Sequence, residues 1–400
     1  MTRWEWALTT RDTNRLVRPL EWGWEWLADC GGLEAEANVP GSDATTAAKA
    51  AAMTALNLSL IARPAEFFRY KTPQDFRVEQ RHPELFPTNV REETLEQELE
   101  YQRRAVTGEL RRAPFLRFTS AVRTPHPEND MVNARWYEAP RAAGDSRPKQ
   151  AIVVMPQWNA DAFSHNVLCE MFNRFGISAL RLSKPYHDIR RPSELERSDY
   201  AVSSNVGRTL SSARQAVADI RACLDWLESQ GYEHFGVLGT SLGSCYGFLA
   251  AAMDPRLEVC AYNHVSTSFG DVIWEGQSTR HVTAAFRDAG LTQEQVRGLF
   301  TAISPSSYVE QFSAKARRVL MIYAPWDLTF PLHLSLEAIA GLRAHGTEPE
   351  VKVLPCGHYT TGEWPFKYLD GWYMGSFVRR AFRALAAERA GGARVQLSVR

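Results

Sequence analysis

The pattern of apolar positions predicts strands and helices in alternation over most of the chain. Continuous apolar runs, typical of buried parallel strands, are followed by longer segments with apolar residues three and four positions apart, the clearest being 207–230. The predicted strands are 151–155, 177–182, 235–239, 257–263, 318–323 and 350–354. This alternation predicts an α/β fold with an open, mostly parallel, doubly wound sheet.

The remaining segments predict additions to this sheet. Residues 115–123 and 131–138 are rich in aromatic and β-branched residues on either side of a polar turn, which indicates an antiparallel hairpin. Residues 265–312 contain more helical stretches than one crossover needs, which favours a helical cap or lid over a pocket. The main domain is expected at 113–390, ending in a helix at 368–390 and a loosely held tail at 391–400.

Residues 1–112 are expected to form a mainly helical region of their own. An alanine-rich stretch at 44–62 predicts a helix, and the charged stretch 91–112 predicts an exposed helix or connector. Five tryptophans gather near the start of the chain, at positions 4, 6, 22, 24 and 26. They indicate packing against the following domain or, as the less favoured alternative, contact with a membrane interface.

One short stretch carries the clearest chemistry. After the predicted strand 235–239, Gly239, Ser241 and Gly243 form the pattern Gly-x-Ser-x-Gly, and an apolar helix follows. A serine hydroxyl is a weak nucleophile that must stand clear of the sheet to meet a base, and the sharp turn leaves no room for side chains two residues away. The helix start would also leave the Leu242 N–H free to stabilise an oxyanion. The alternative is an ordinary glycine turn with a capping serine.

Composition narrows the class of protein without naming an activity. The 46 basic and 46 acidic residues balance, and no basic stripe indicates a nucleic-acid partner. Six scattered cysteines favour buried thiols in a reducing cytosol. No signal-peptide run and no stretch of roughly twenty apolar residues is present, so we expect a soluble, cytoplasmic protein. Phosphate-loop and zinc-pair motifs are missing, and we expect neither a metal nor a cofactor.

Two further residues follow predicted strands in a suggestive order. Asp327 comes after 318–323, and His358 comes after 350–354, preceded by a glycine. The carboxyl ends of parallel strands meet at one edge of the sheet, where chemistry is usually found. Asp327 could instead cap a helix and His358 could be a loop histidine; Asp271 is the fallback acid. His264, beside another strand end, is interpreted as pocket lining or core.

With the order Ser…Asp…His, residues 115–389 resemble an α/β hydrolase of the serine esterase/lipase superfamily. The resemblance implies that Ser241 is the nucleophile, His358 the general base and Asp327 the residue that orients it. Family members often carry His-Gly before the second oxyanion donor, whereas this chain has Pro156-Gln157. Aligning the two pairs assigns that donor to Trp158, with the Gln157 side chain as an alternative.

The leading hypothesis is a serine hydrolase of carboxylic esters or thioesters that acts on a small acyl substrate. The candidate substrate-binding residues are Gln157, Tyr186, Phe269, Trp274 and Trp326. A serine peptidase or acyltransferase with the same triad is one alternative, and a non-catalytic binding protein of the same fold is another. The N-terminal region would also offer a surface for a homo-oligomer.

Overall fold

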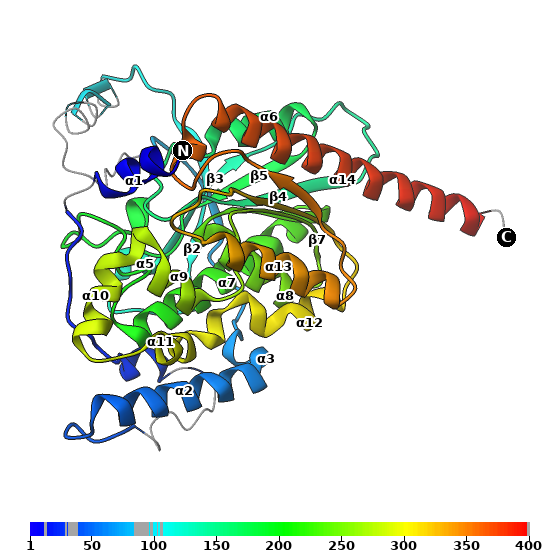
Figure 1. Ribbon diagram of the computed structural model, residues 1–400. Helices are drawn as coiled ribbons and strands as arrows, with labels where there is room; N and C mark the ends of the chain where they lie inside the picture. The colour runs from blue at the N-terminus through cyan, green and yellow to red at the C-terminus, as the bar shows by residue number, and fades with distance from the viewer. Residues whose placement is uncertain are drawn as a thin grey trace.

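The computed structural model describes residues 1–11, 14–28, 30, 39–83, 96, 99–101, 103, 104 and 107–397, with only the backbone for 389–397. Within these residues one sheet of nine strands runs through the centre of the molecule (Figure 1). The strands are β1 (Arg77–Arg81), β2 (Ala113–Thr119), β3 (Met131–Tyr137), β4 (Lys149–Met155), β5 (Ser178–Leu182), β6 (Tyr232–Thr240), β7 (Leu257–Asn263), β8 (Arg318–Tyr323) and β9 (Glu350–Val353).

The strand order is β1-β2-β3-β5-β4-β6-β7-β8-β9. Strands β1, β2, β3 and β5 pair antiparallel in turn, and every pairing from β5 to β9 is parallel. The predicted mostly parallel sheet is confirmed, as is the hairpin of β2 and β3. Strand β1 lies in the region expected to be mainly helical; its sequence Arg-Val-Glu-Gln-Arg has one apolar residue, so no alternation marks it as an edge strand.

Helices cover both faces of the sheet. Helices α6 (Asn166–Arg174) and α14 (Phe366–Leu397) lie on one face, and α7 (Val206–Ser229), α8 (Leu242–Met253) and α13 (Leu332–Ala344) lie on the other (Figure 1). Along β4, Val153 and Met155 pack with the α7 and α8 side, while Ile152 and Val154 pack with α6 and α14. Burial on both faces explains the continuous apolar runs of the central strands.

A series of short helices connects β7 with β8, in agreement with the helical stretches expected in 265–312; this segment is called the cap, and its role as a lid over a pocket stays a prediction. They are α9 (Phe269–Glu275), η3 (Gln277–Thr279), α10 (Arg280–Asp288), α11 (Gln293–Leu299), η4 (Thr301–Ile303), η5 (Pro305–Tyr308) and α12 (Val309–Ser313). The alanine-rich helix α2 (Thr46–Ala62) lies against this cap from outside (Figure 1). The Ala302 N–H donates to Asn57 Oδ1 at 3.0 Å, and Gly298 lies against Thr54 so closely that a Cβ would collide.

The other segments of the N-terminal region also pack on the main domain. They include α1 (Thr2–Thr10), η1 (Trp24–Leu27) and α3 (Pro64–Phe67). The main domain also has three short helices, α5 (Pro127–Asp130), η2 (Asp188–Arg190) and η6 (Thr360–Gly362). Trp22 and Trp24 are partly buried against the core, whereas Trp4 and Trp6 are exposed by 41% and 57%. The tryptophans therefore divide between core and surface. In the stretch 91–112, expected to be an exposed helix or connector, positions 91–95, 97, 98, 102, 105 and 106 lie outside the described residues, and 96, 99–101, 103 and 104 are helical.

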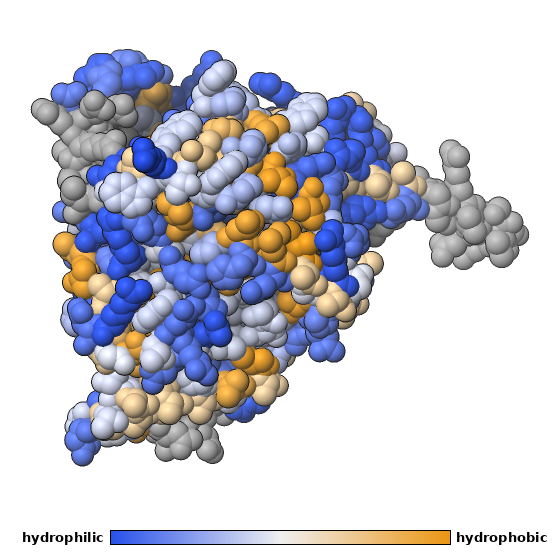
Figure 2. All heavy atoms as spheres, in the orientation of Figure 1, coloured by the Kyte–Doolittle hydropathy of each residue, from blue (hydrophilic) through white to orange (hydrophobic). Residues whose placement is uncertain are grey.

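Helix α14 extends past the expected end at residue 390 to Leu397, so the backbone from 391 to 397 is helical where a tail was expected. Alanine and arginine beside the paired glycines favour continued helix. Figure 2 shows apolar atoms at the surface between α14 and α13. Leu336 on α13 and Val353 on β9 are exposed. All six cysteines are buried, as predicted. Among the described residues no helix has the length and apolar character that crossing a membrane requires.

Candidate active site

Ser241 sits in a strained turn between β6 and α8. Its φ of 57° and ψ of −121° lie in a region that non-glycine residues rarely adopt, and its N–H donates to the Asn263 carbonyl at 2.8 Å. A Cβ on Gly239 would lie 2.3 Å from the Gly243 carbonyl oxygen, and one on Gly243 would lie 2.1 Å from the Met155 oxygen. Both glycines are therefore required by close backbone contacts, as the motif predicts.

The loops after β8 and β9 bring Asp327 and His358 to this turn. His358 Nε2 lies 2.9 Å from Ser241 Oγ, and His358 Nδ1 lies 2.8 Å from Asp327 Oδ2. The other carboxylate oxygen of Asp327 accepts the N–H groups of Thr329 and Phe330, both at 2.7 Å. The structure thus brings the three predicted side chains into one chain of contacts.

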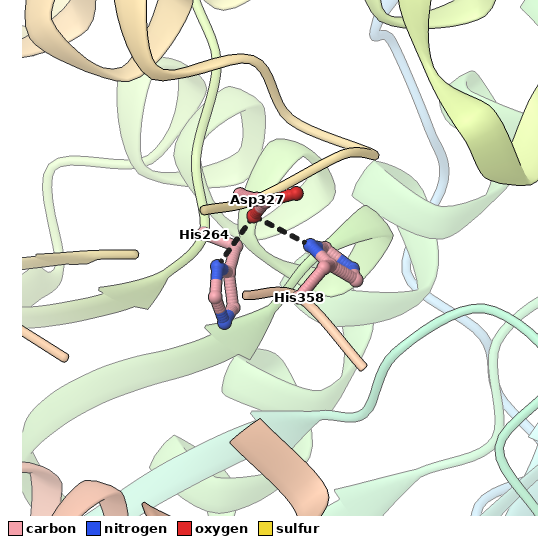
Figure 3. A group of neighbouring side chains, drawn as sticks. All are labelled: His264, Asp327 and His358. Atoms are coloured by element: carbon pink, nitrogen blue, oxygen red, sulfur yellow. Dashed lines mark hydrogen bonds and ion pairs between the residues drawn. The ribbon is translucent and has the colours of Figure 1, made fainter. Parts of the chain in front are cut away.

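A second imidazole lies against the same carboxylate. His264, directly after β7, places Nδ1 2.8 Å from Asp327 Oδ2 and Nε2 3.0 Å from Thr361 Oγ1 (Figure 3). Its φ of 55° lies in the left-handed region, and its N–H donates to the Ile322 carbonyl at 2.9 Å. The interpretation of His264 as pocket lining or core missed this contact. The available signal was its place at a strand end, shared with Ser241, Asp327 and His358.

The electrostatics of the group follow from burial and shared charge. Burial favours the neutral form of Asp327, but the two nearby imidazoles outweigh it and hold its pKa below the ordinary value. Burial disfavours the cation of His358, but the carboxylate of Asp327 outweighs it and raises the pKa of His358. Burial and the neighbouring His358 lower the pKa of His264. The lowered pKa favours the neutral form of His264, whose Nδ1 is the ring nitrogen that faces the carboxylate.

The contacts bear on the fallback acid Asp271 and on a metal site, which the sequence does not predict. The fallback acid Asp271 is bound to Arg297, with Nε 2.7 Å from Oδ2, and within the described part of the chain no hydrogen bond or ion pair joins it to a histidine. His264, Asp327 and His358 hold atoms of the kinds that bind zinc within 4.8 Å of one another. Because His358 Nε2 faces the Ser241 hydroxyl at 2.9 Å, the contacts of this group are those of a proton relay.

The loop after β4 lies against the serine turn. The close approach of Gly243 to the Met155 and Pro156 carbonyl oxygens joins the two segments through their backbones. Leu242 begins α8, so its N–H belongs to the first turn of the helix. Trp158 is held by a bond from its Nε1 to the Ser198 carbonyl at 2.9 Å, and its ring stacks on His281. The Gln157 carbonyl accepts from the buried Lys184 at 2.9 Å.

The remaining candidate substrate-binding residues are scattered. Trp326, next to Asp327, is 42% exposed and donates its N–H to the Cys356 carbonyl. Tyr186 is buried and packs edge-on against Tyr200. Phe269 is buried against Phe300, and Trp274 on α9 lies under the guanidinium of Arg287. Of these four, Trp326 is the one that adjoins a triad residue in the chain, Asp327.

Two buried carboxyl groups near the site had no signal in the sequence. Glu5 on α1 accepts hydrogen bonds from the segment that follows His358. Asp370 on α14 accepts from Asn263 Nδ2 at 2.9 Å, and burial raises the pKa of Asp370 to about 8. Both contacts join segments more than a hundred residues apart, so no local pattern marks them.

Comparisons with known proteins agree with this fold. A family model described as "Alpha/beta hydrolase domain containing 18" matches residues 134–316. Among the curated proteins, none matches the chain. The solved acetyl xylan esterase from Paenibacillus sp. R4 aligns with a TM-score of 0.52 and 14% identity, covering 85% of this chain and 97% of that one.

Two further solved structures are similar. The acetyl xylan esterase 1 from Thermoanaerobacterium sp. JW/SL YS485 has a TM-score of 0.51 and 13% identity, covering 85% of this chain and 96% of that one. An acylaminoacyl peptidase from Pyrococcus horikoshii has a TM-score of 0.51 and 15% identity, covering 69% of this chain and 43% of that one. The chain thus matches less than half the length of the peptidase, and at these identities the likeness is one of fold.

Proposed function

Because the chain belongs to the α/β-hydrolase superfamily, we propose that it is a serine hydrolase that cleaves carboxylic esters or thioesters through an acyl-enzyme on Ser241. The observation that carries the proposal is the position of His358, with Nε2 2.9 Å from Ser241 Oγ and Nδ1 2.8 Å from Asp327 Oδ2. A hydroxyl, an imidazole and a carboxylate in this order convert a weak nucleophile into a reactive one.

In the first half of the reaction, His358 Nε2 takes the proton of Ser241 as Oγ attacks the substrate carbonyl carbon. The carbonyl π electrons move to oxygen and form a tetrahedral oxyanion. When this intermediate collapses, the bond to the alcohol or thiol breaks, and His358 gives its proton to the leaving group. Asp327 stabilises the imidazolium throughout through Nδ1.

In the second half, water replaces the leaving group. His358 takes a proton from the water as its oxygen attacks the acyl carbon, and returns that proton to Ser241 when the acid is released. The oxyanion of both halves would accept from the Leu242 N–H, with the Trp158 N–H as the second donor. Losing one such donor typically costs about 3 kcal/mol of transition-state stabilisation. The acyl group would lie against Trp158 and Trp326, and the reaction needs no cofactor.

The test is covalent labelling of the folded protein. A fluorophosphonate should add its mass once to the intact chain, and peptide mapping should find it on Ser241. The matched control is Ser244→Ala, because Ser244 lies in the same helix turn but its hydroxyl is bound to the Gly239 and Asn263 carbonyls at 2.7 Å. Ser241→Ala should abolish labelling and ester hydrolysis, whereas Ser244→Ala should label. An unlabelled wild type that is folded by circular dichroism would contradict the proposal.

A comparison of substrates separates ester hydrolysis from the competing peptidase and acyltransferase activities. The p-nitrophenyl ester, the thioester and the p-nitroanilide of one acyl group would be compared, with and without an added alcohol acceptor. Faster release from the anilide than from the ester would indicate a peptidase, and ester product exceeding free acid would indicate an acyltransferase. We expect hydrolysis of the ester or thioester to dominate.

A further inference from the structure

Helix α1 buries a carboxylate in the catalytic loop. Glu5 is fully buried, while Trp4 and Trp6 on either side of it are exposed. A buried carboxylate is costly unless hydrogen bonds replace its water. Here they do: Oε1 accepts the Tyr359 N–H at 2.8 Å, and Oε2 accepts the Thr360 N–H at 2.9 Å and the Thr360 hydroxyl at 3.0 Å.

These donors follow His358 directly in the chain. The Thr360 hydroxyl also receives the Gly357 N–H at 2.6 Å, so Glu5 and Thr360 together fix the backbone on both sides of the histidine. At Gly357 a Cβ would lie 2.5 Å from the Glu5 carboxyl group. The glycine before the histidine is therefore explained by the approach of Glu5.

A second contact links the same N-terminal segment to the cap. Arg15 donates to the Ser278 carbonyl at 2.5 Å and to the Tyr359 hydroxyl at 3.1 Å. Ser278 belongs to η3, and its hydroxyl lies 3.2 Å from the Tyr359 hydroxyl. The N-terminal segment thus touches the histidine loop and the cap at adjacent points. Figure 1 shows α1 beside the start of α14. The ring centroids of Trp4 on α1 and Phe366 on α14 are 6.3 Å apart.

We propose that Glu5 is a positioning residue of the active site, which holds His358 in register with Ser241 from outside the hydrolase sheet. The inference rests on the proposed serine hydrolase function and gives the N-terminal region a part in it. Both oxygens of Glu5 face donors, so both are needed. The negative charge also adds, after that of Asp327, to the raised pKa of His358.

The variants follow from this geometry. Glu5→Gln keeps the size of the side chain, but its amide NH₂ must face a backbone N–H, so one contact becomes repulsive. Glu5→Ala removes all three bonds, and Glu5→Asp restores the charge with a shorter reach. Arg3→Gln, on the exposed side of α1, is the surface control. Asn57→Ala removes a buried bond from α2 to the cap, away from the histidine loop, and controls for lost stability.

Three measurements test the proposal: the fluorophosphonate labelling rate, kcat and KM for an ester across pH, and hydrogen exchange of the peptide 355–363. Glu5→Gln and Glu5→Ala should lower kcat and the labelling rate by about 10- to 100-fold, because small misplacements of a catalytic group have effects of this size. KM should change little. The acid limb of kcat/KM should move to lower pH, and exchange of 355–363 should rise.

Glu5→Asp should recover part of the rate, Arg3→Gln should behave as wild type, and Asn57→Ala should lose melting temperature without these changes. Labelling, pH profile and exchange of Glu5→Gln that all match wild type would overturn the inference. If the wild type does not label but hydrogen exchange of 355–363 is faster in Glu5→Ala, the proposed hydrolase function would be wrong. Glu5 would then still be the residue that fixes the loop.

Discussion

The Nδ1 atom of His264 lies 2.8 Å from Oδ2 of Asp327, the same oxygen that meets His358. The Asp327 carboxylate therefore has four close neighbours: two backbone N–H groups at Oδ1 and two imidazoles at Oδ2. Because His264 also reaches Thr361 Oγ1 in the loop of His358, it connects the acid to the base by a second route.

We predict that His264→Leu lowers kcat about tenfold, which corresponds to about 1.4 kcal/mol, because the 2.8 Å contact of Nδ1 with the Asp327 carboxylate is lost. His264→Asn should retain more activity, since its side-chain N–H can face Asp327. The exposed His345→Asn serves as the control. Steady-state kinetics measure kcat of the three variants, and melting temperatures show whether they are folded. An unchanged kcat in a folded His264→Leu variant would mean that His264 has a packing role only.

The pH dependence should follow His358. This residue acts as a base only when neutral, and its pKa is raised above the usual 6.5 by Asp327. Activity should therefore be lost as pH falls through a midpoint above 6.5. The pKa of His264 is lowered, so its ionisation should fall on the acid side of that of His358. Measuring kcat/KM from pH 5 to 9 checks this.

Removing the acid should change both the rate and this midpoint. Asp327→Asn is expected to lower kcat by about 10⁴-fold, since the imidazole loses its orienting partner, and to shift the remaining acid limb to lower pH. Asp271→Asn, at the fallback acid bound to Arg297, should leave the midpoint in place. A large loss with Asp271→Asn and none with Asp327→Asn would reverse the assignment.

Asp370 should make stability depend on pH. Its carboxyl group is buried, Oδ1 has no hydrogen-bond partner among the described residues, and its pKa rises from 3.8 to about 8. Between these values the unfolded chain is ionised and the folded protein is protonated, so stability falls as pH rises through this window. The slope for one proton is at most about 1.4 kcal/mol per pH unit.

Asp370→Asn removes this ionisation with little change in shape. Its advantage over wild type in urea unfolding should therefore grow between pH 5 and pH 7.5, whereas Asp288→Asn at an exposed site should give a constant difference. A wild-type-to-variant difference that stays flat across this range would mean that Asp370 is ionised in the folded protein.

Two glycines in helices should respond oppositely to alanine. In α8, a Cβ on Gly243 would lie 2.1 Å from the Met155 oxygen, so Gly243→Ala should lose about 2–4 kcal/mol of stability and most of the serine labelling. In α13, the nearest atom to a Cβ on Gly341 is 3.9 Å away, so Gly341→Ala should gain about 0.5–1 kcal/mol. Urea unfolding measures the free energy of unfolding of both variants. Equal changes in the two would contradict the difference between the two Cβ distances.

The parts of the molecule that could be predicted from the sequence are those that depend on residues close together in the chain. Buried strands are continuous apolar runs, and each strand end points to one edge of the sheet, which is why Ser241, Asp327 and His358 could be selected without coordinates. The elbow also requires glycine at fixed spacing, because its turn leaves no room for side chains.

The remainder depended on contacts between distant segments. His264 resembles any histidine after a strand until Asp327 is known to face it, and Glu5 resembles any acidic residue of an amphipathic helix. Strand β1 has a polar sequence without alternation, so only its pairing with β2 identifies it as a strand. Such features are set by tertiary neighbours, which a single sequence does not reveal.

The packing of α2 on the cap has a consequence for how a substrate reaches Ser241. Swinging the cap outward would break the Asn57–Ala302 bond and separate Thr54 from Gly298, so the N-terminal region would have to move with it. These contacts join the cap to α2 and oppose such a movement. Ester turnover should rise smoothly with substrate concentration, without the jump at the micelle threshold that marks an enzyme with a swinging lid.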